Sequence, residues 1–128
     1  KLPYEERLLL IMALIPHLQS DFYTKKFSGP GGIDDIPSDY GLVTGGVFRG
    51  LIPTGLTYLY LLGPDNLLTK SEIYDKIYNK KMKVINEGAV GIMPVPVNEP
   101  FLSGTLTMSL EYAISFITNN PIKTKSDV

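Results

Sequence analysis

The amino-acid sequence predicts a small α+β domain, and two features of the sequence carry that prediction. Apolar residues recur at helical spacing in several segments before residue 80, and the pattern changes to that of strands between residues 89 and 107. The chain has 128 residues, the usual size of one domain, and no cysteine, which excludes disulfides and thiolate metal sites. We expect a domain at 1–120, followed at 121–128 by a polar tail or linker that leads to a C-terminal module.

The N-terminal segment predicts a buried helix that begins at Pro3, since proline fits the first turn of a helix. Residues 8–16 are apolar nearly all round, so other elements should cover this helix on most sides. The run is too short to span a membrane. Pro16 should break or kink the helix, and a second helical piece should follow through Phe27.

Residues 28–55 predict a long irregular segment, because glycine and proline are frequent there. Loops of this length in compact domains are usually functional or partly disordered. The part at 45–55 mixes apolar side chains and an arginine with glycines, and aromatic residues and arginine are enriched at the centres of protein interfaces. We therefore expect a docking surface formed by Phe48, Arg49, Leu51, Ile52 and Pro53. The alternative is that Phe48 and Ile52 fill the domain's own core.

Two further helices follow this loop. Thr54 should cap the first of them, which should stop at Gly63 because glycine is a frequent stop signal. Thr69 and Glu72 have the spacing of a capping box, in which each side chain satisfies a backbone N–H of the other residue. They should open a helix that ends near Asn79.

The C-terminal part predicts a β-hairpin and a last helix. Residues 89–95 and 101–107 have the composition of two strands joined by a proline-containing turn, and residues 83–85 add a short strand. Pro94 has no N–H for a ladder, so its strand should lie at an edge or a bulge. Ser109 should cap the last helix, and the apolar face of that helix comprises Leu110, Ala113, Ile114 and Ile117. Helices followed by a hairpin and a helix are typical of a winged-helix variant, here with a long glycine- and proline-rich loop.

Catalytic and metal-binding chemistry have few candidates in the sequence. His17 is the single histidine, and nothing resembles a nucleophile elbow, so we interpret His17 as a helix-end residue that bonds a carbonyl. Asp34, Asp35 and Asp39 lack EF-hand spacing, and the glycines and prolines around them indicate turns. We predict no catalytic residue, no metal site and no cofactor in this chain.

Two other readings involve phosphate groups. Residues 50–55 lack the lysine of a phosphate-binding loop, and Pro53 has no N–H to contact a phosphate. Binding of an anion at the start of the helix near Thr54 stays an alternative. The basic cluster of the sequence consists of Lys76, Lys80, Lys81 and Lys83. If the domain is instead the DNA-binding winged helix of a regulator, these four lysines would form its nucleic-acid-binding surface. The chain has 12 basic and 13 acidic residues, which gives a formal net charge of −1. This charge argues against the DNA-binding alternative.

Three stretches of the chain resemble one known family. They are 6–17 (ERLLLIMALIPH), 45–55 (GGVFRGLIPTG) and 99–109 (EPFLSGTLTMS). The family is the N-terminal region of AAA-type ATPases encoded with bacterial contractile injection systems, the phage-tail-like particles. In that family a variant winged-helix domain precedes the ATPase module. The sequence departs from the pattern where Leu56 follows Gly55, because the family has a longer polar insert before its Pro-Thr-Gly and usually a glutamate after it.

The resemblance implies a cytoplasmic, non-catalytic accessory domain that docks onto proteins. Its partners would be its own AAA module and components of the particle, with oligomers formed through the parent protein. ATP would be bound and hydrolysed by a module beyond Val128, since no Walker residue is present in this sequence. We expect no membrane binding and no strong DNA binding. The DNA-binding regulator and a stand-alone small enzyme are the alternatives.

Overall fold

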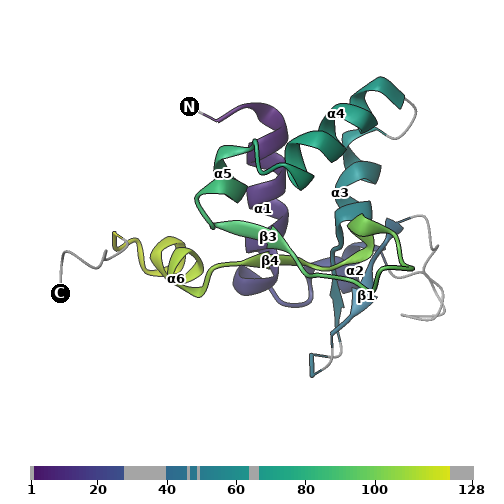
Figure 1. Ribbon diagram of the computed structural model, residues 1–128. Helices are drawn as coiled ribbons and strands as arrows, with labels where there is room; N and C mark the ends of the chain where they lie inside the picture. Colours follow the sequence, from purple (N-terminus) through teal and green to yellow (C-terminus); the bar gives the residue numbers. More distant parts are fainter. Residues whose placement is uncertain (1, 28–39, 46, 49, 64–66, 122–128) are drawn as a thin grey trace.

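The computed structural model describes residues 2–27, 40–45, 47–48, 50–63 and 67–121 (Figure 1). These residues form a small α+β domain in which helices surround two small antiparallel sheets, an arrangement compatible with the predicted winged-helix-like fold. In this part of the chain no helix is long and apolar enough to cross a bilayer.

The first helix, α1 (Tyr4–Leu18), runs through Pro16, the residue that we expected to break or kink it. Proline has no N–H, so the carbonyl of Met12, four residues earlier, loses its helical donor. The hydroxyl of Tyr23, in α2 (Phe22–Phe27), donates to that carbonyl oxygen at 2.9 Å. Burial raises the pKa of Tyr23, which keeps the hydroxyl protonated as a donor. The helix therefore ends after Leu18 rather than at the proline.

The start and the end of α3 (Gly55–Leu62) are as predicted. The Thr54 hydroxyl oxygen accepts hydrogen bonds from the backbone N–H groups of Leu56 and Thr57. In return the Thr57 hydroxyl oxygen accepts from the Thr54 N–H at 3.0 Å, which completes a reciprocal cap. Gly63 ends the helix with φ of 111°, a conformation that side chains disfavour.

Two predictions about the following helices are wrong. Helix α4 (Leu67–Tyr78) begins before Thr69, so Thr69 lies inside the helix rather than at its N-cap. The expected strand at 83–85 is instead a short helix, α5 (Lys83–Asn86). The reason lies far away in the sequence, because the Val84 N–H donates to the buried carboxylate of Glu6 in α1 at 3.1 Å. A distant carboxylate thus satisfies a free donor at the start of α5.

The predicted C-terminal hairpin is present, with shorter strands than expected. Strands β3 (Val90–Ile92) and β4 (Leu106–Met108) pair antiparallel, with Gly91 opposite Thr107. Pro94 lies beyond the end of the ladder. Residues expected to begin the second strand form a 3-10 helix instead, η3 (Phe101–Ser103).

The chain just before α3 also joins this hairpin. Thr54 bridges Thr105, the Leu106 N–H donates to the Pro53 carbonyl at 3.0 Å, and the Gly55 N–H donates to the Gly104 carbonyl at 3.2 Å. An extended segment between the first two major helices therefore lies beside β4, as the first strand of a winged-helix fold does. The core forms where α1, α3, α4 and the hairpin meet, and consists of Leu9, Met12, Ala13, Tyr58, Leu59, Ile73, Ile77, Met82, Val84, Ala89, Val90 and Leu102.

Candidate docking groove

The segment that we predicted to dock partners is not irregular, because part of it forms a second hairpin. Strands β1 (Val43–Thr44) and β2 (Leu51–Ile52) pair antiparallel. The Gly45 N–H donates to the Phe48 carbonyl at 3.0 Å near the hairpin turn. The Leu51 N–H donates to the hydroxyl oxygen of Thr24 in α2 at 2.9 Å, which fixes the hairpin against the helical part of the domain.

The structure divides the five predicted docking residues into different environments. Leu51, 2% exposed, and Pro53 are buried inside the domain. Ile52 is half-buried, and Phe48 keeps 39% of its surface exposed. Arg49 lies outside the described residues. Of the predicted set, Phe48 and Ile52 are therefore the described side chains that a partner can reach.

Phe48 and Ile52 lie together in a groove of about 380 Å³. One wall comes from the end of α1 and the turn after it, and another comes from β4. The other lining residues are Ala13, Pro16, His17, Ser20, Leu106, Thr107 and Met108. Residues of three separate parts of the sequence thus form one mostly apolar groove, which sequence reasoning did not predict because it treated the loop alone.

The polar groups of this groove are an imidazole and two hydroxyls, from His17, Ser20 and Thr107. Activation of a serine by histidine also uses a carboxylate that orients the imidazole. The described lining residues include no carboxylate. The arrangement favours the binding of an apolar side chain next to a few hydrogen-bonding groups, the usual composition of a binding groove.

A second exposed apolar surface lies on α6 (Leu110–Thr118). The sequence placed Leu110, Ala113, Ile114 and Ile117 on one apolar face of this helix, and of these four only Ala113 is buried. Among the described elements, α6 packs mainly against α1, so most of this apolar face stays exposed. Ser109 precedes the helix as predicted but makes no side-chain cap.

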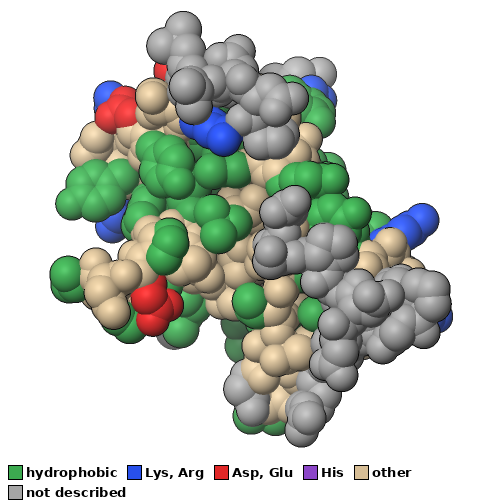
Figure 2. Space-filling view, turned by 90° about the vertical axis from the view of Figure 1, so that its right-hand side faces the viewer, with side chains coloured by type: hydrophobic (Ala, Val, Ile, Leu, Met, Phe, Trp, Pro, Cys, Tyr) green, Lys and Arg blue, Asp and Glu red, His purple; other side chains and the backbone are tan. Residues whose placement is uncertain are grey.

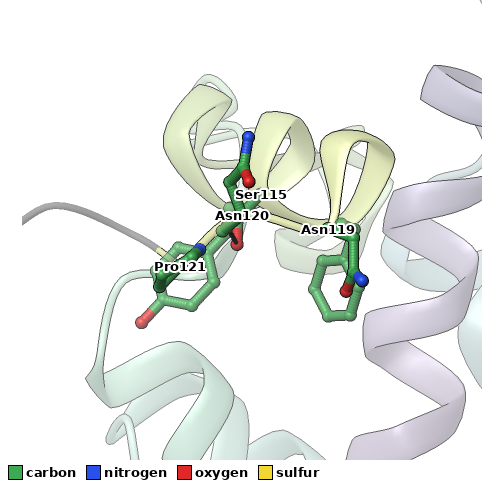
Figure 3. A pocket seen from close by; sticks show the side chains of 6 residues that line it. Ser115, Asn119, Asn120 and Pro121 are labelled. Carbon is green, nitrogen blue, oxygen red and sulfur yellow. Dashed lines mark hydrogen bonds between the residues drawn. The ribbon is translucent and has the colours of Figure 1, made fainter.

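The C-terminal end of α6 carries a shallow hollow that Figure 3 shows from close by. Ser115, Asn120 and Pro121 lie together on one side of it, and Asn119 lies apart from them. The Ser115 hydroxyl donates to the Asn120 carbonyl, so its hydrogen is already engaged within the helix end. The described residues that line this hollow come from the end of one helix and include no charged group.

The four lysines of the alternative nucleic-acid surface do not act as one basic patch. Lys76 pairs with Glu5 of α1 at 3.4 Å, and Lys81 pairs with Asp75 at 2.6 Å. The hydrogen bond from Lys81 is the main cause that lowers the pKa of Asp75, which keeps that carboxylate charged beside the lysine. Lys80 and Lys83 are exposed and form no ion pair with described residues.

The remaining candidate sites lie outside the described residues or are already occupied. Asp34, Asp35 and Asp39 fall outside, and in the described ranges no cluster of histidine, aspartate and glutamate could hold a metal ion. At the start of α3 the N–H groups that could face an anion donate to Thr54 and to the Gly104 carbonyl. Comparisons of the chain with protein-family models, with curated proteins and with solved structures give no match.

Proposed function

We propose that this chain is a non-catalytic accessory domain of a bacterial, cytoplasmic AAA-type ATPase, and that it docks onto the ATPase module of the same protein. The ATPase part of the proposal rests on the resemblance of residues 6–17, 45–55 and 99–109 to that family. The docking part rests on the groove of Phe48 and Ile52. ATP binding and hydrolysis would belong to the module, and particle components would be further partners.

The observation that supports docking most directly is the position of Phe48. A phenylalanine with 39% of its surface exposed lies at an apolar groove and is held by a short hairpin that α2 supports. Partly exposed aromatic side chains next to a hollow are frequent centres of binding energy in protein interfaces. The DNA-binding alternative has weaker support, because two of its four lysines are neutralised by carboxylates.

The ATPase part is tested by the coding sequence that follows Val128. We expect a Gly-x-x-x-x-Gly-Lys-Thr motif there, because a phosphate-binding loop is required for ATP hydrolysis in this class. A coding sequence that stops or continues without this motif would contradict the ATPase assignment.

The docking part is tested by calorimetric titration of this domain with the separately purified ATPase module. Phe48→Ser should weaken binding at least about tenfold, as expected for a central aromatic contact. Val47→Ser is the matched control, since Val47 is 94% exposed and does not line the groove. Equal binding by the wild-type domain and the Phe48 variant would show that the groove is not the docking site.

A further inference from the structure

Three aromatic side chains form a second surface, separate from the groove of Phe48 and Ile52 and next to the predicted lysine cluster. The ring of Phe101, from η3, lies 5.6 Å from the ring of Tyr78 in an edge-on arrangement and 6.5 Å from the ring of Tyr74. Tyr78 is 71% exposed, and the other two keep more than a third of their surface exposed. We call these three residues the aromatic shelf. Tyr74 and Tyr78 lie near the lysines in the sequence, and only the folded chain brings Phe101 beside them.

The face of the domain that carries α3 and α4, on the right of Figure 1, is rich in hydrophobic side chains (Figure 2). Acidic and basic side chains lie at the margins of this hydrophobic region (Figure 2). Exposed apolar regions with a polar rim commonly mark interaction sites. The exposure of the three rings of the shelf therefore requires an explanation beyond folding.

A groove of about 370 Å³ lies next to the shelf. Its lining combines aliphatic residues of α4, α5 and β3 with two residues of the shelf and one lysine: Ile77, Tyr78, Lys80, Ile85, Val90, Gly91, Ile92 and Phe101. Among the described residues, the lining holds one cation and no carboxylate. A ligand with an apolar side chain next to a negative charge would match both the apolar lining and the lysine.

Lys80, the lysine in this groove, has no ion-pair partner among the described residues, unlike Lys76 and Lys81. Lys81 and Lys76 are paired with Asp75 and Glu5, whereas Lys80 forms no ion pair with any described residue. Lys80 also has φ of 54°, the left-handed conformation that ends the turn after α4. Lys80 thus lies at the edge of an apolar groove without a carboxylate partner among the described residues.

The strand at the groove also offers backbone groups to a partner. The Ala89 carbonyl accepts from the Ser109 N–H, and the Met93 N–H donates to the Thr105 carbonyl, so odd-numbered residues of this strand face β4. In an antiparallel pair the alternate residues turn their N–H and C=O groups to the other edge. Ile92, which is half-exposed and lines the groove, is one of these alternate residues.

We propose that the aromatic shelf and this groove bind an extended peptide segment, in which a proline or aliphatic residue enters the groove and an acidic residue pairs with Lys80. Extended and proline-rich segments bind aromatic-lined grooves in many domains, and a free strand edge adds backbone hydrogen bonds. A single-stranded nucleic acid would also use aromatic rings and lysine. The aliphatic floor formed by Ile77, Ile85 and Val90 favours a side chain over a base. This proposal involves a different surface from the docking groove and stands independently of it.

The test measures fluorescence anisotropy of a labelled peptide of alternating proline and leucine that ends in two aspartates. The wild-type chain should bind it, and the same peptide with two lysines in place of the aspartates should bind at least about tenfold more weakly, because like charges would then meet. Tyr78→Ala should also weaken binding of the aspartate peptide. It removes one wall of the groove from an exposed position and should leave folding intact.

Lys80→Asp and Lys83→Asp provide a matched pair of variants with the same change of charge. Aspartate tolerates the left-handed conformation at position 80, and Lys83 is exposed at the start of α5 without lining the groove. Lys80→Asp should weaken binding at least about tenfold, whereas Lys83→Asp should not change it measurably. The proposal is overturned if the wild-type chain does not bind the peptide, if both variants lose affinity equally, or if an oligothymidine binds more tightly than the aspartate peptide and displaces it.

Discussion

Helices α1 and α6 are both rich in apolar residues, yet the structure buries the centre of α1 and leaves most of α6 exposed. In α1, Leu9 is fully buried and Met12 and Ala13 are nearly so. In α6, Ala113 is the one buried residue, and Ile117 is 52% exposed. The difference teaches that an apolar helical pattern identifies a surface that avoids water, but does not identify the element that will cover it.

The cause of the difference is position in the fold. Helix α1 contacts α2, α3, α5, α6 and both strands of the β3–β4 hairpin, so it is covered on several sides. Helix α6 follows the last strand and packs mainly against α1. The contribution of each helix to the stability of the domain should therefore differ, although both helices are rich in apolar residues.

The largest effect should come from a cavity in the centre of α1. Leu9 has no exposed surface and belongs to the main core. Leu9→Ala should lower the free energy of unfolding by about 2–5 kcal/mol, because it removes buried methyl groups and leaves a cavity. Urea denaturation followed by circular dichroism measures this change. A loss of under about 1 kcal/mol would mean that α1 is not the central helix of the core.

An intermediate effect should come from the contact that carries α1 through its proline. Tyr23→Phe leaves the buried Met12 carbonyl without its donor and should cost about 1–3 kcal/mol of unfolding free energy. The control is the same substitution in a Pro16→Ala background, where the alanine N–H can donate to that carbonyl. The cost of Tyr23→Phe should then be clearly smaller. Equal costs in both backgrounds would rule out compensation between the tyrosine and the proline.

The smallest effect should come from the exposed side of α6. Ile117→Ser should change the free energy of unfolding by no more than about 0.5 kcal/mol, since the side chain already contacts water. Ala113→Leu, on the buried side of the same helix, should destabilise the domain by about 1–3 kcal/mol through overpacking. If the serine variant is as unstable as the leucine variant, α6 is covered more fully than the described residues indicate.

Much of the fold followed from local chemistry that the sequence displays directly. The cap at Thr54, the stop at Gly63 and the C-terminal hairpin were predicted because each depends on residues close to one another in the chain. The α+β class followed from the change of hydrophobic period. In the docking segment, the sequence indicated that Phe48 and Ile52 are accessible to a partner or buried in the core, and it could not decide between the two.

Tertiary contacts decided the features that depend on residues far apart. Pro16 remains inside a helix because Tyr23 reaches the Met12 carbonyl, and residues 83–86 are helical where Glu6 satisfies the Val84 N–H. The groove that contains Phe48 likewise needs walls from α1 and β4. The sequence by itself determined the α+β class, most of the longer helices and the C-terminal hairpin, since backbone propensity and hydrophobic period act over a few residues. Only the folded chain determined which polar groups are satisfied and which apolar faces stay open, because both depend on the three-dimensional neighbours of each residue.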